Sequence, residues 1–114
     1  MNIQIINKKI SHSHLQRIAK EDFGDMVKGV ADIRKNIIAL GGELHADAEA
    51  VLLKEGSRQE DLWGFNIYPA RQASERIEFT SLINVRPKQG NRALVIQDPQ
   101  LCQKIREIVD NLTE

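Results

Sequence analysis

The periodicity of apolar residues changes between Gly41 and Pro69, and this change constrains the fold more than any other feature of the sequence. In the first half of the segment, apolar residues recur at the spacing i, i+4, i+7, i+8 of a core-facing helix: Leu44, Ala48, Val51 and Leu52. In the second half they alternate with other residues, as in a half-buried strand: Trp63, Phe65 and Ile67. Gly56 is suited to end the helix, and Pro69 closes the strand because it cannot donate a ladder hydrogen bond. A helix followed so soon by a strand predicts a domain that contains both.

The backbone around His45 has two alternative interpretations, which differ in their chemistry. On a strand, side chains alternate, so four polar groups would share one face and resemble a metal site: Glu43, His45, Asp47 and Glu49. On a helix, residues four apart share a face, so His45 lies beside Glu49 and Asp47 points elsewhere. We favour a helix from about Ala46, because alanine and leucine dominate the segment. One His–Glu pair does not provide the three or four converging ligands of a zinc site, so we expect no metal. The simplest interpretation is that His45 caps or packs, with Asp47 and Glu49 in solvent.

The remaining patterns predict a sheet with helices between its strands. Further strands are expected at Asn2–Asn7, Met26–Ile33, Ile37–Gly42 and Arg76–Arg86. Helices are expected after Ser11, a suitable N-cap, and after Asp98-Pro99, an N-cap followed by proline at the first helical position. Lys35-Asn36 can supply a tight turn that makes the two middle strands a hairpin. Arg76–Arg86 has the longest alternating pattern and should pair antiparallel with Leu62–Tyr68.

These elements, in the order β-α-β-β-α-β-β-α, predict an α+β fold. We expect a single domain over residues 1–114, with a mixed, mostly antiparallel sheet of about five strands and three helices. The helices should pack mainly on one face of that sheet. The first β-α-β step is compatible with a right-handed parallel crossover.

Charge and cysteine content exclude several classes of protein. The 114 residues contain 16 basic and 16 acidic side chains, and this balance argues against nonspecific nucleic-acid binding, which needs a positive excess. The single cysteine, Cys102, rules out an internal disulfide and fits a reducing compartment. No apolar run reaches the roughly 18 residues of a membrane span, and the N-terminus lacks the apolar core of a signal peptide. We therefore expect a soluble, cytoplasmic protein with no membrane partner.

Polar residues gather on the second face of the last predicted hairpin and in the loop that follows it. Asn66 lies on one strand, and Asn84 and Arg86 lie on its partner. The loop PKQGNR then adds Asn91 and Arg92, and loops held by a rigid scaffold often carry binding residues. Arginine and exposed backbone N–H groups can hold a carboxylate or phosphate. The pattern predicts an anion-capable pocket, but the solvent side of any antiparallel sheet is also polar.

With these patterns laid out, three stretches of the chain resemble a small microbial family that is known only as a domain of unknown function: GGELHADAEAVLL, GSRQEDLWGFNIYP and IEFTSLINVRPKQGNR. They cover about half of the chain, and GS-x-QEDLWG-x-N-x-YP is an unusual string. The family has no assigned activity, so the resemblance implies no catalytic residues. It does draw attention to the positions that these motifs contain: His45, Trp63, Asn66, Asn84, Arg86, Asn91 and Arg92.

Two functional classes follow from these patterns. The first is a small binding or regulatory module, with a homo-oligomer as one option, whose polar pocket takes a small anionic ligand. The alternative is a small enzyme in which His45 acts as general base beside Glu49 while Arg86 holds an anionic substrate. The enzyme hypothesis lacks a nucleophile, a metal set and a cofactor motif, since Gly41-Gly42 has neither the GxGxxG pattern nor a P-loop lysine. We therefore expect no cofactor and favour the binding module, with these ligand-binding residues: His45, Asn66, Asn84, Arg86, Asn91 and Arg92.

Overall fold

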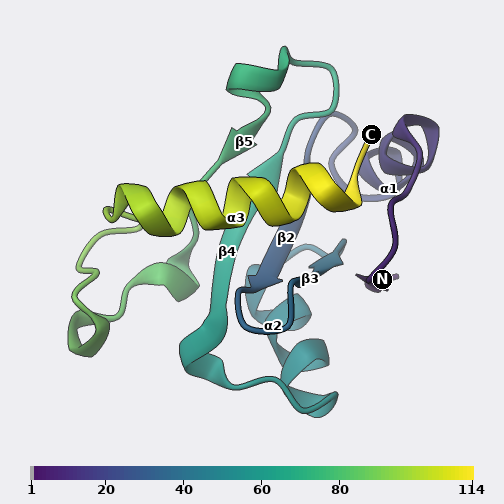
Figure 1. Cartoon of the computed structure of the whole chain (residues 1–114). Coiled ribbons are helices and arrows are strands. Elements are labelled where there is room, and N and C mark those ends of the chain that lie inside the picture. The colour runs from purple at the N-terminus through teal and green to yellow at the C-terminus, as the bar shows by residue number, and fades with distance from the viewer. Residues whose placement is uncertain (1) are drawn as a thin grey trace.

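The computed structural model describes residues 2–114, which form one five-stranded sheet and three α-helices (Figure 1). The strands are β1 (Gln4–Ile6), β2 (Val27–Asp32), β3 (Ile37–Leu40), β4 (Leu62–Ile67) and β5 (Ile77–Glu78). The α-helices are α1 (His12–Asp22), α2 (His45–Lys54) and α3 (Pro99–Leu112). Four short 3₁₀ helices lie in the connections: η1 (Gln59–Asp61), η2 (Ala73–Glu75), η3 (Leu82–Asn84) and η4 (Pro87–Gln89). The α+β class and the predicted order of strands and α-helices are confirmed.

The sheet has the strand order β1-β3-β2-β4-β5, and every neighbouring pair is antiparallel. The described strands therefore form no parallel pair. β1 and β2 run in the same direction, but β3 lies between them, so the first β-α-β step passes over one strand. The predicted β2–β3 hairpin is confirmed, and Asn36 takes the left-handed conformation in its turn, with φ of 58°.

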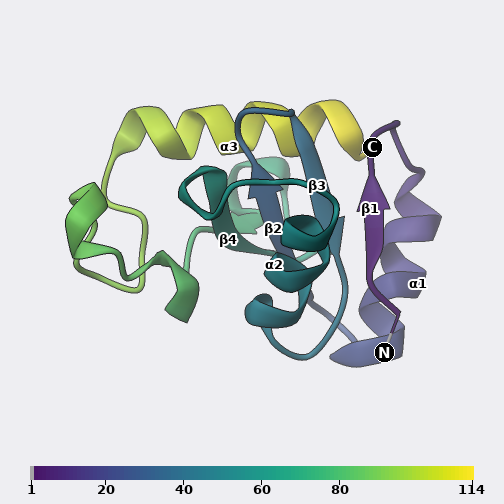
Figure 2. The same cartoon turned by 90° about the horizontal axis from the view of Figure 1, so that it is seen from below.

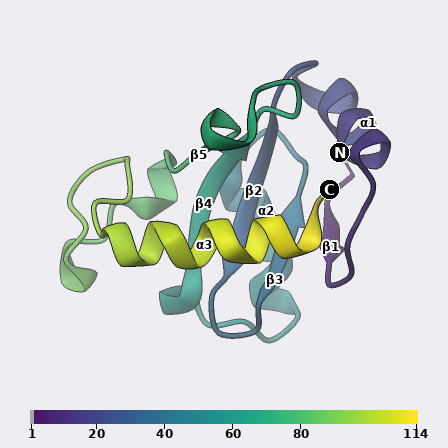
Figure 3. The same cartoon turned by 45° about the horizontal axis from the view of Figure 1, so that its top comes forward.

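The helices cover both faces of the sheet, so the expectation that they pack mainly on one face is wrong. α1 and α3 pack on one face over the larger apolar cluster, and α2 packs on the other (Figure 2). In Figure 3, α3 crosses in front of the strands while α2 lies behind them. The physical reason lies in β2 and β3, whose apolar residues point both ways: Val30 and Ala39 face Ala48 and Leu52 of α2. None of the helices within residues 2–114 has the length and apolar character needed to cross a membrane.

Local signals place the helix ends correctly. The hydroxyl of Ser11 accepts a hydrogen bond from the backbone N–H of His14 at 3.1 Å, which caps α1. The carboxylate of Asp98 accepts from the N–H of Gln100 at 2.9 Å and caps α3. Gly56 follows α2 with φ of 100°, a conformation that side chains disfavour.

The predicted strand Arg76–Arg86 is wrong over most of its length. Only Ile77 and Glu78 pair with β4, and the chain then turns into η3 and η4. Ser81 comes so close to β4 that a Cβ on Gly64 would lie 2.5 Å from the Cβ of Ser81. Asn84 takes the place of the missing strand: its side chain accepts from the N–H of Gly64 at 2.8 Å and donates to the carbonyl of Gly64 at 3.0 Å. A side chain thus satisfies backbone groups that a longer β5 would have paired.

Candidate functional site

Two cavities open beside α2 and η3, and both have Leu82 and Ile83 in their walls. The Arg86 cavity has a volume of about 660 Å³, and its other lining residues include Glu49, Gln59, Val85, Arg86, Lys88 and Gln89. The His45 cavity has a volume of about 340 Å³, and its other lining residues include Lys28, Leu44, His45, Ala46, Asn66 and Ser81. Both volumes fall within the range of roughly 300–1,000 Å³ that is usual for small-molecule sites. The two cavities differ in how their polar groups are used.

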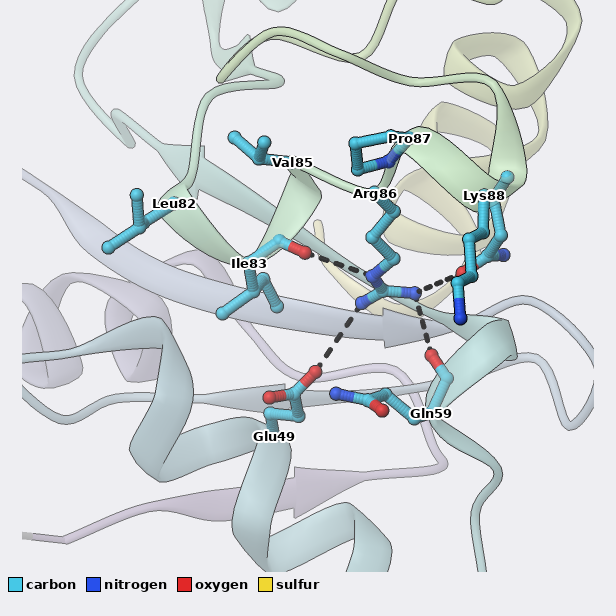
Figure 4. A pocket seen from close by; sticks show the side chains of 9 residues that line it. Glu49, Gln59, Leu82, Ile83, Val85, Arg86, Pro87 and Lys88 are labelled. Carbon is cyan, nitrogen blue, oxygen red and sulfur yellow. Dashed lines mark hydrogen bonds and ion pairs between the residues drawn. The ribbon is translucent and has the colours of Figure 1, made fainter.

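The guanidinium of Arg86 is fully engaged inside the protein (Figure 4). Its five acceptors are the carbonyls of Gln59, Leu62 and Ile83 and the side chains of Glu49 and Gln89. The bond to the Gln59 carbonyl is 2.7 Å long, and the ion pair with Glu49 is 3.4 Å long. Since a guanidinium has five N–H donors, none is left for a ligand. Arg86 therefore joins α2, η1, β4, η3 and η4.

Burial and an aromatic ring reinforce this structural role. The Arg86 and Glu49 side chains are only 11% and 12% exposed, so Glu49 is not in solvent as the sequence suggested. The guanidinium also lies 4.7 Å from the centre of the Trp63 ring, which adds a cation–π contact. Burial lowers the pKa of Arg86 and the nearby Glu49 carboxylate raises it, but an arginine remains charged in either case.

The two predicted asparagines of this region are also used internally. Asn84 has no exposed surface and pairs with Gly64 of β4 as described above. Asn91 donates to the carbonyl of Asn84 at 2.8 Å and accepts from the backbone N–H of Gln97 at 2.8 Å, so it organises the loop. Arg92 is exposed and lines neither cavity. The structure therefore does not bring Asn84, Arg86 and Arg92 together in one pocket, and their role in ligand binding stays a prediction.

His45 lies in the other cavity and is 8% exposed. Its Nε2 is 2.9 Å from the carbonyl oxygen of Phe65, and because a carbonyl only accepts, Nε2 carries the hydrogen. The pKa of His45 is lowered from its ordinary 6.5, chiefly by burial and also by Lys28, although hydrogen bonds to Phe65 and to the Asn66 side chain and the charge of Glu78 oppose this shift. A neutral ring with a hydrogen on Nε2 has its acceptor lone pair on Nδ1. His45 bonds to Phe65 while Glu49 bonds to Arg86, so the acid–base pair of the enzyme hypothesis is not formed.

Asn66 also lines the His45 cavity and is 6% exposed. Its Nδ2 donates to Oε1 of Glu78 at 2.8 Å and to the carbonyl of Thr80 at 3.3 Å. Its Oδ1 is enclosed and makes no hydrogen bond of normal geometry among residues 2–114, but the Asn66 side chain still acts on the ring of His45, because a side-chain hydrogen bond between the two raises the pKa of His45. Two other enclosed side-chain atoms also make no hydrogen bond among residues 2–114, Trp63 Nε1 and Arg76 Nε, but neither residue lines one of the two cavities.

Positive charge borders the same cavity from two directions. Lys28 of β2 lies directly opposite Asn66 in the antiparallel pairing. The first turn of α2 begins at His45, and its N-cap, Leu44, has no side-chain acceptor for the free N–H groups of that turn. Asp47, the acidic residue of this turn, is not part of the lining. Sequence reasoning missed Lys28 because only the register of β2 against β4 places it beside Asn66, and no local signal encodes that register.

No group of three or more histidine, cysteine, aspartate or glutamate side chains within residues 2–114 is arranged to hold a metal ion. The chain matches no curated protein and no solved structure. A family model does match it over residues 4–112, with the description "Protein of unknown function (DUF5674)". This finding agrees with the resemblance to an uncharacterised domain family. Because the match runs from the first residue of β1 to the last residue of α3, the chain belongs to the DUF5674 family of proteins of unknown function.

Proposed function

We propose that this domain is a small-molecule-binding module, and that its ligand is an organic anion that occupies the His45 cavity. The observation that carries the proposal is Lys28, which lines this cavity with no acidic residue beside it among the described lining residues.

The charges around the cavity favour an anion. Lys28 is the only lysine, arginine, aspartate or glutamate among the described residues that line it. The N–H groups of His45 and Ala46 lie in the first turn of α2, where the helix dipole attracts negative charge. The Arg86 cavity differs, because Glu49 neutralises Arg86 there and Lys88 is exposed.

Apolar side chains at the cavity favour an organic ligand over an inorganic ion. Leu44 and Leu82 line the cavity and are 58% and 78% exposed, although both are large and apolar. A carbon skeleton that covers them would contribute hydrophobic free energy to binding. Small-molecule sites commonly combine such apolar walls with a few well-placed polar groups.

The test is a thermal-shift screen with organic carboxylates and phosphate esters on the whole chain. A bound ligand raises the melting temperature by mass action, with about 2.7 kcal/mol of stabilisation at roughly 100 times its Kd. We expect Lys28→Gln to weaken binding of any anion that scores by about tenfold or more, the loss of one charge-assisted contact. The matched control is Lys88→Gln, which removes a lysine from the other cavity and should leave binding unchanged. Binding that depends on Lys88 and not on Lys28 would place the ligand in the Arg86 cavity and refute the proposal.

A further inference from the structure

We infer that the anion bound in the His45 cavity is a straight-chain carboxylic acid, whose alkyl chain crosses Leu82 and continues along the apolar side of the Arg86 cavity. This inference rests on the proposed function, because it names the ligand class of the same site. Acids with long alkyl chains should therefore bind more tightly than short ones.

The two cavities are neighbours in the fold, so one small molecule can occupy both. Leu82 and Ile83 of η3 line both of them. On α2, His45 lines one cavity and Glu49 lines the other, and residues four apart share a face of a helix. These two residues are separated by about 6 Å along the helix axis. An extended chain advances about 1.2 Å per single bond, so roughly five bonds cover this distance.

The charged groups of the Arg86 cavity have protein partners and do not call for a second acid group. Arg86 and Glu49 form an ion pair with a distance of 3.4 Å. The side chain of Gln89 accepts from Arg86 at 3.3 Å and donates to the carbonyl of Glu60 at 2.9 Å. Because Arg86 has no donor left for an anion, a neutral part of the ligand suits this cavity better than an acid group.

Apolar side chains on one side of the Arg86 cavity remain in water. Leu82 is 78% exposed and Val85 is 39% exposed. Figure 4 shows Leu82 and Ile83 toward one end of the cavity and Gln59 and Lys88 toward the other. An alkyl chain that covers Leu82 and Val85 would remove apolar surface from water and leave the end formed by Gln59 and Lys88 untouched.

The charge around the His45 cavity suits a carboxylate better than a phosphate ester. Lys28 is the only lysine or arginine among the described residues that line it. The start of α2 adds about half a positive charge. A carboxylate brings one negative charge, whereas a phosphate ester brings about 1.5 to 2. The head group therefore lies beside Lys28 and the first turn of α2, and the chain extends from there toward Leu82.

The experiment is an NMR titration of the whole chain with butanoate, hexanoate, octanoate and decanoate, at concentrations below those at which the acids form micelles. Each methylene that leaves water raises the affinity by up to about fourfold, so decanoate should bind at least about tenfold more tightly than hexanoate. The methyl signals of Val85 should shift with decanoate and stay unchanged with butanoate. Lys28→Gln should weaken binding of every acid by a similar factor, because all four share the head group.

Leu82→Ala tests the path of the chain, because Leu82 borders both cavities and is too exposed to be needed for folding. We expect a loss of about fivefold or more in the affinity for decanoate, and a smaller loss for butanoate. The matched control is Leu53→Ala. Leu53 is an apolar residue of α2 that is 40% exposed and lines neither cavity, so its change should leave both affinities as they are.

Three outcomes would overturn the inference: equal affinity along the series, an unchanged affinity of Leu82→Ala for decanoate, or binding that begins only when the acids form micelles. Tighter binding of octyl phosphate than of octanoate would also overturn it, because the head group would then be a phosphate. In each case the proposed function still stands if an anion binds and needs Lys28. Failure of all these acids to bind, together with a negative result in the wider screen of anions, would refute the proposed function as well.

Discussion

The Arg86 cavity and the His45 cavity lie side by side, yet they use their polar groups in opposite ways. In the Arg86 cavity, all five guanidinium donors have protein acceptors, and the charge is neutralised by Glu49. In the His45 cavity, the Oδ1 of Asn66 is unpaired and the lysine has no acidic partner in the lining. In the larger cavity, the arginine therefore has no donor left for an anion.

This difference shows that a charged residue in the sequence is not always free to bind a ligand in the folded protein. An arginine with five acceptors contributes to stability, because its removal leaves carbonyls and a carboxylate without partners. An asparagine with an unpaired oxygen reduces stability unless something else binds to it. The comparison predicts that changes in the Arg86 cavity affect folding, and that changes in the His45 cavity affect binding.

The largest expected effect is that of Arg86→Ala. Loss of a buried ion-pair partner costs about 3–5 kcal/mol, because the remaining carboxylate of Glu49 stays buried without a countercharge. Arg86→Lys should restore little of the lost stability, since an ammonium group cannot replace a planar guanidinium with five N–H donors. Urea unfolding measures the free energy of unfolding, with Lys88→Ala as the control for an exposed lysine of the same cavity. A loss below about 1 kcal/mol for Arg86→Ala would mean that the guanidinium is not a structural element.

The next largest expected effect is a difference in the loss of stability when each of two asparagines beside β4 is changed to leucine. Asn84→Leu leaves the N–H and carbonyl of Gly64 unpaired in a buried position, which costs about 2–4 kcal/mol. Asn66→Leu also removes an oxygen that was already unpaired, so its cost should be at least about 1 kcal/mol smaller. The two leucine variants can be compared by urea unfolding under identical conditions. Equal losses would indicate that Asn66 is as well satisfied as Asn84.

The smallest expected effect is a change in the pH dependence of stability at His45. The folded-state pKa of His45 lies below its ordinary 6.5, so between these two values the unfolded chain binds more protons than the folded chain. The contribution of His45 to stability is therefore complete above 6.5 and is lost as the pH falls toward the folded-state pKa. His45→Gln should lose less stability than the parent between about pH 7 and pH 5. A steeper loss in the variant would show that the buried ring is readily protonated.

Much of the fold could be predicted because its signals are local. The caps at Ser11 and Asp98, the turn at Asn36 and the end of α2 before Gly56 each depend on a few neighbouring residues. The alternating pattern of Arg76–Arg86 is also local, but it predicts a long strand, and most of that strand does not form. Asn84 pairs with Gly64 through its side chain, and that contact joins residues 20 positions apart.

The candidate site could be predicted only in part for the same reason. His45 and Asn66 were both expected to bind a ligand, and the structure places them in one cavity. Nothing in the sequence pairs Lys28 with Asn66, because that neighbourhood depends on the register of two strands. Likewise, the number of acceptors around Arg86 depends on how η1, β4 and η3 converge in space. The periodicity of apolar residues in the sequence does not predict that arrangement.

The most direct test of anion binding in the His45 cavity is an NMR titration of the ¹⁵N-labelled chain with an anion that raises its melting temperature. We expect the backbone amides of His45 and Ala46 and the side-chain amide of Asn66 to shift together, with one saturation curve. The amides of Gln59, Lys88 and Gln89 should shift little. Large shifts in the Arg86 cavity, with the signals of His45 and Asn66 unchanged, would show that the anion does not bind in the His45 cavity.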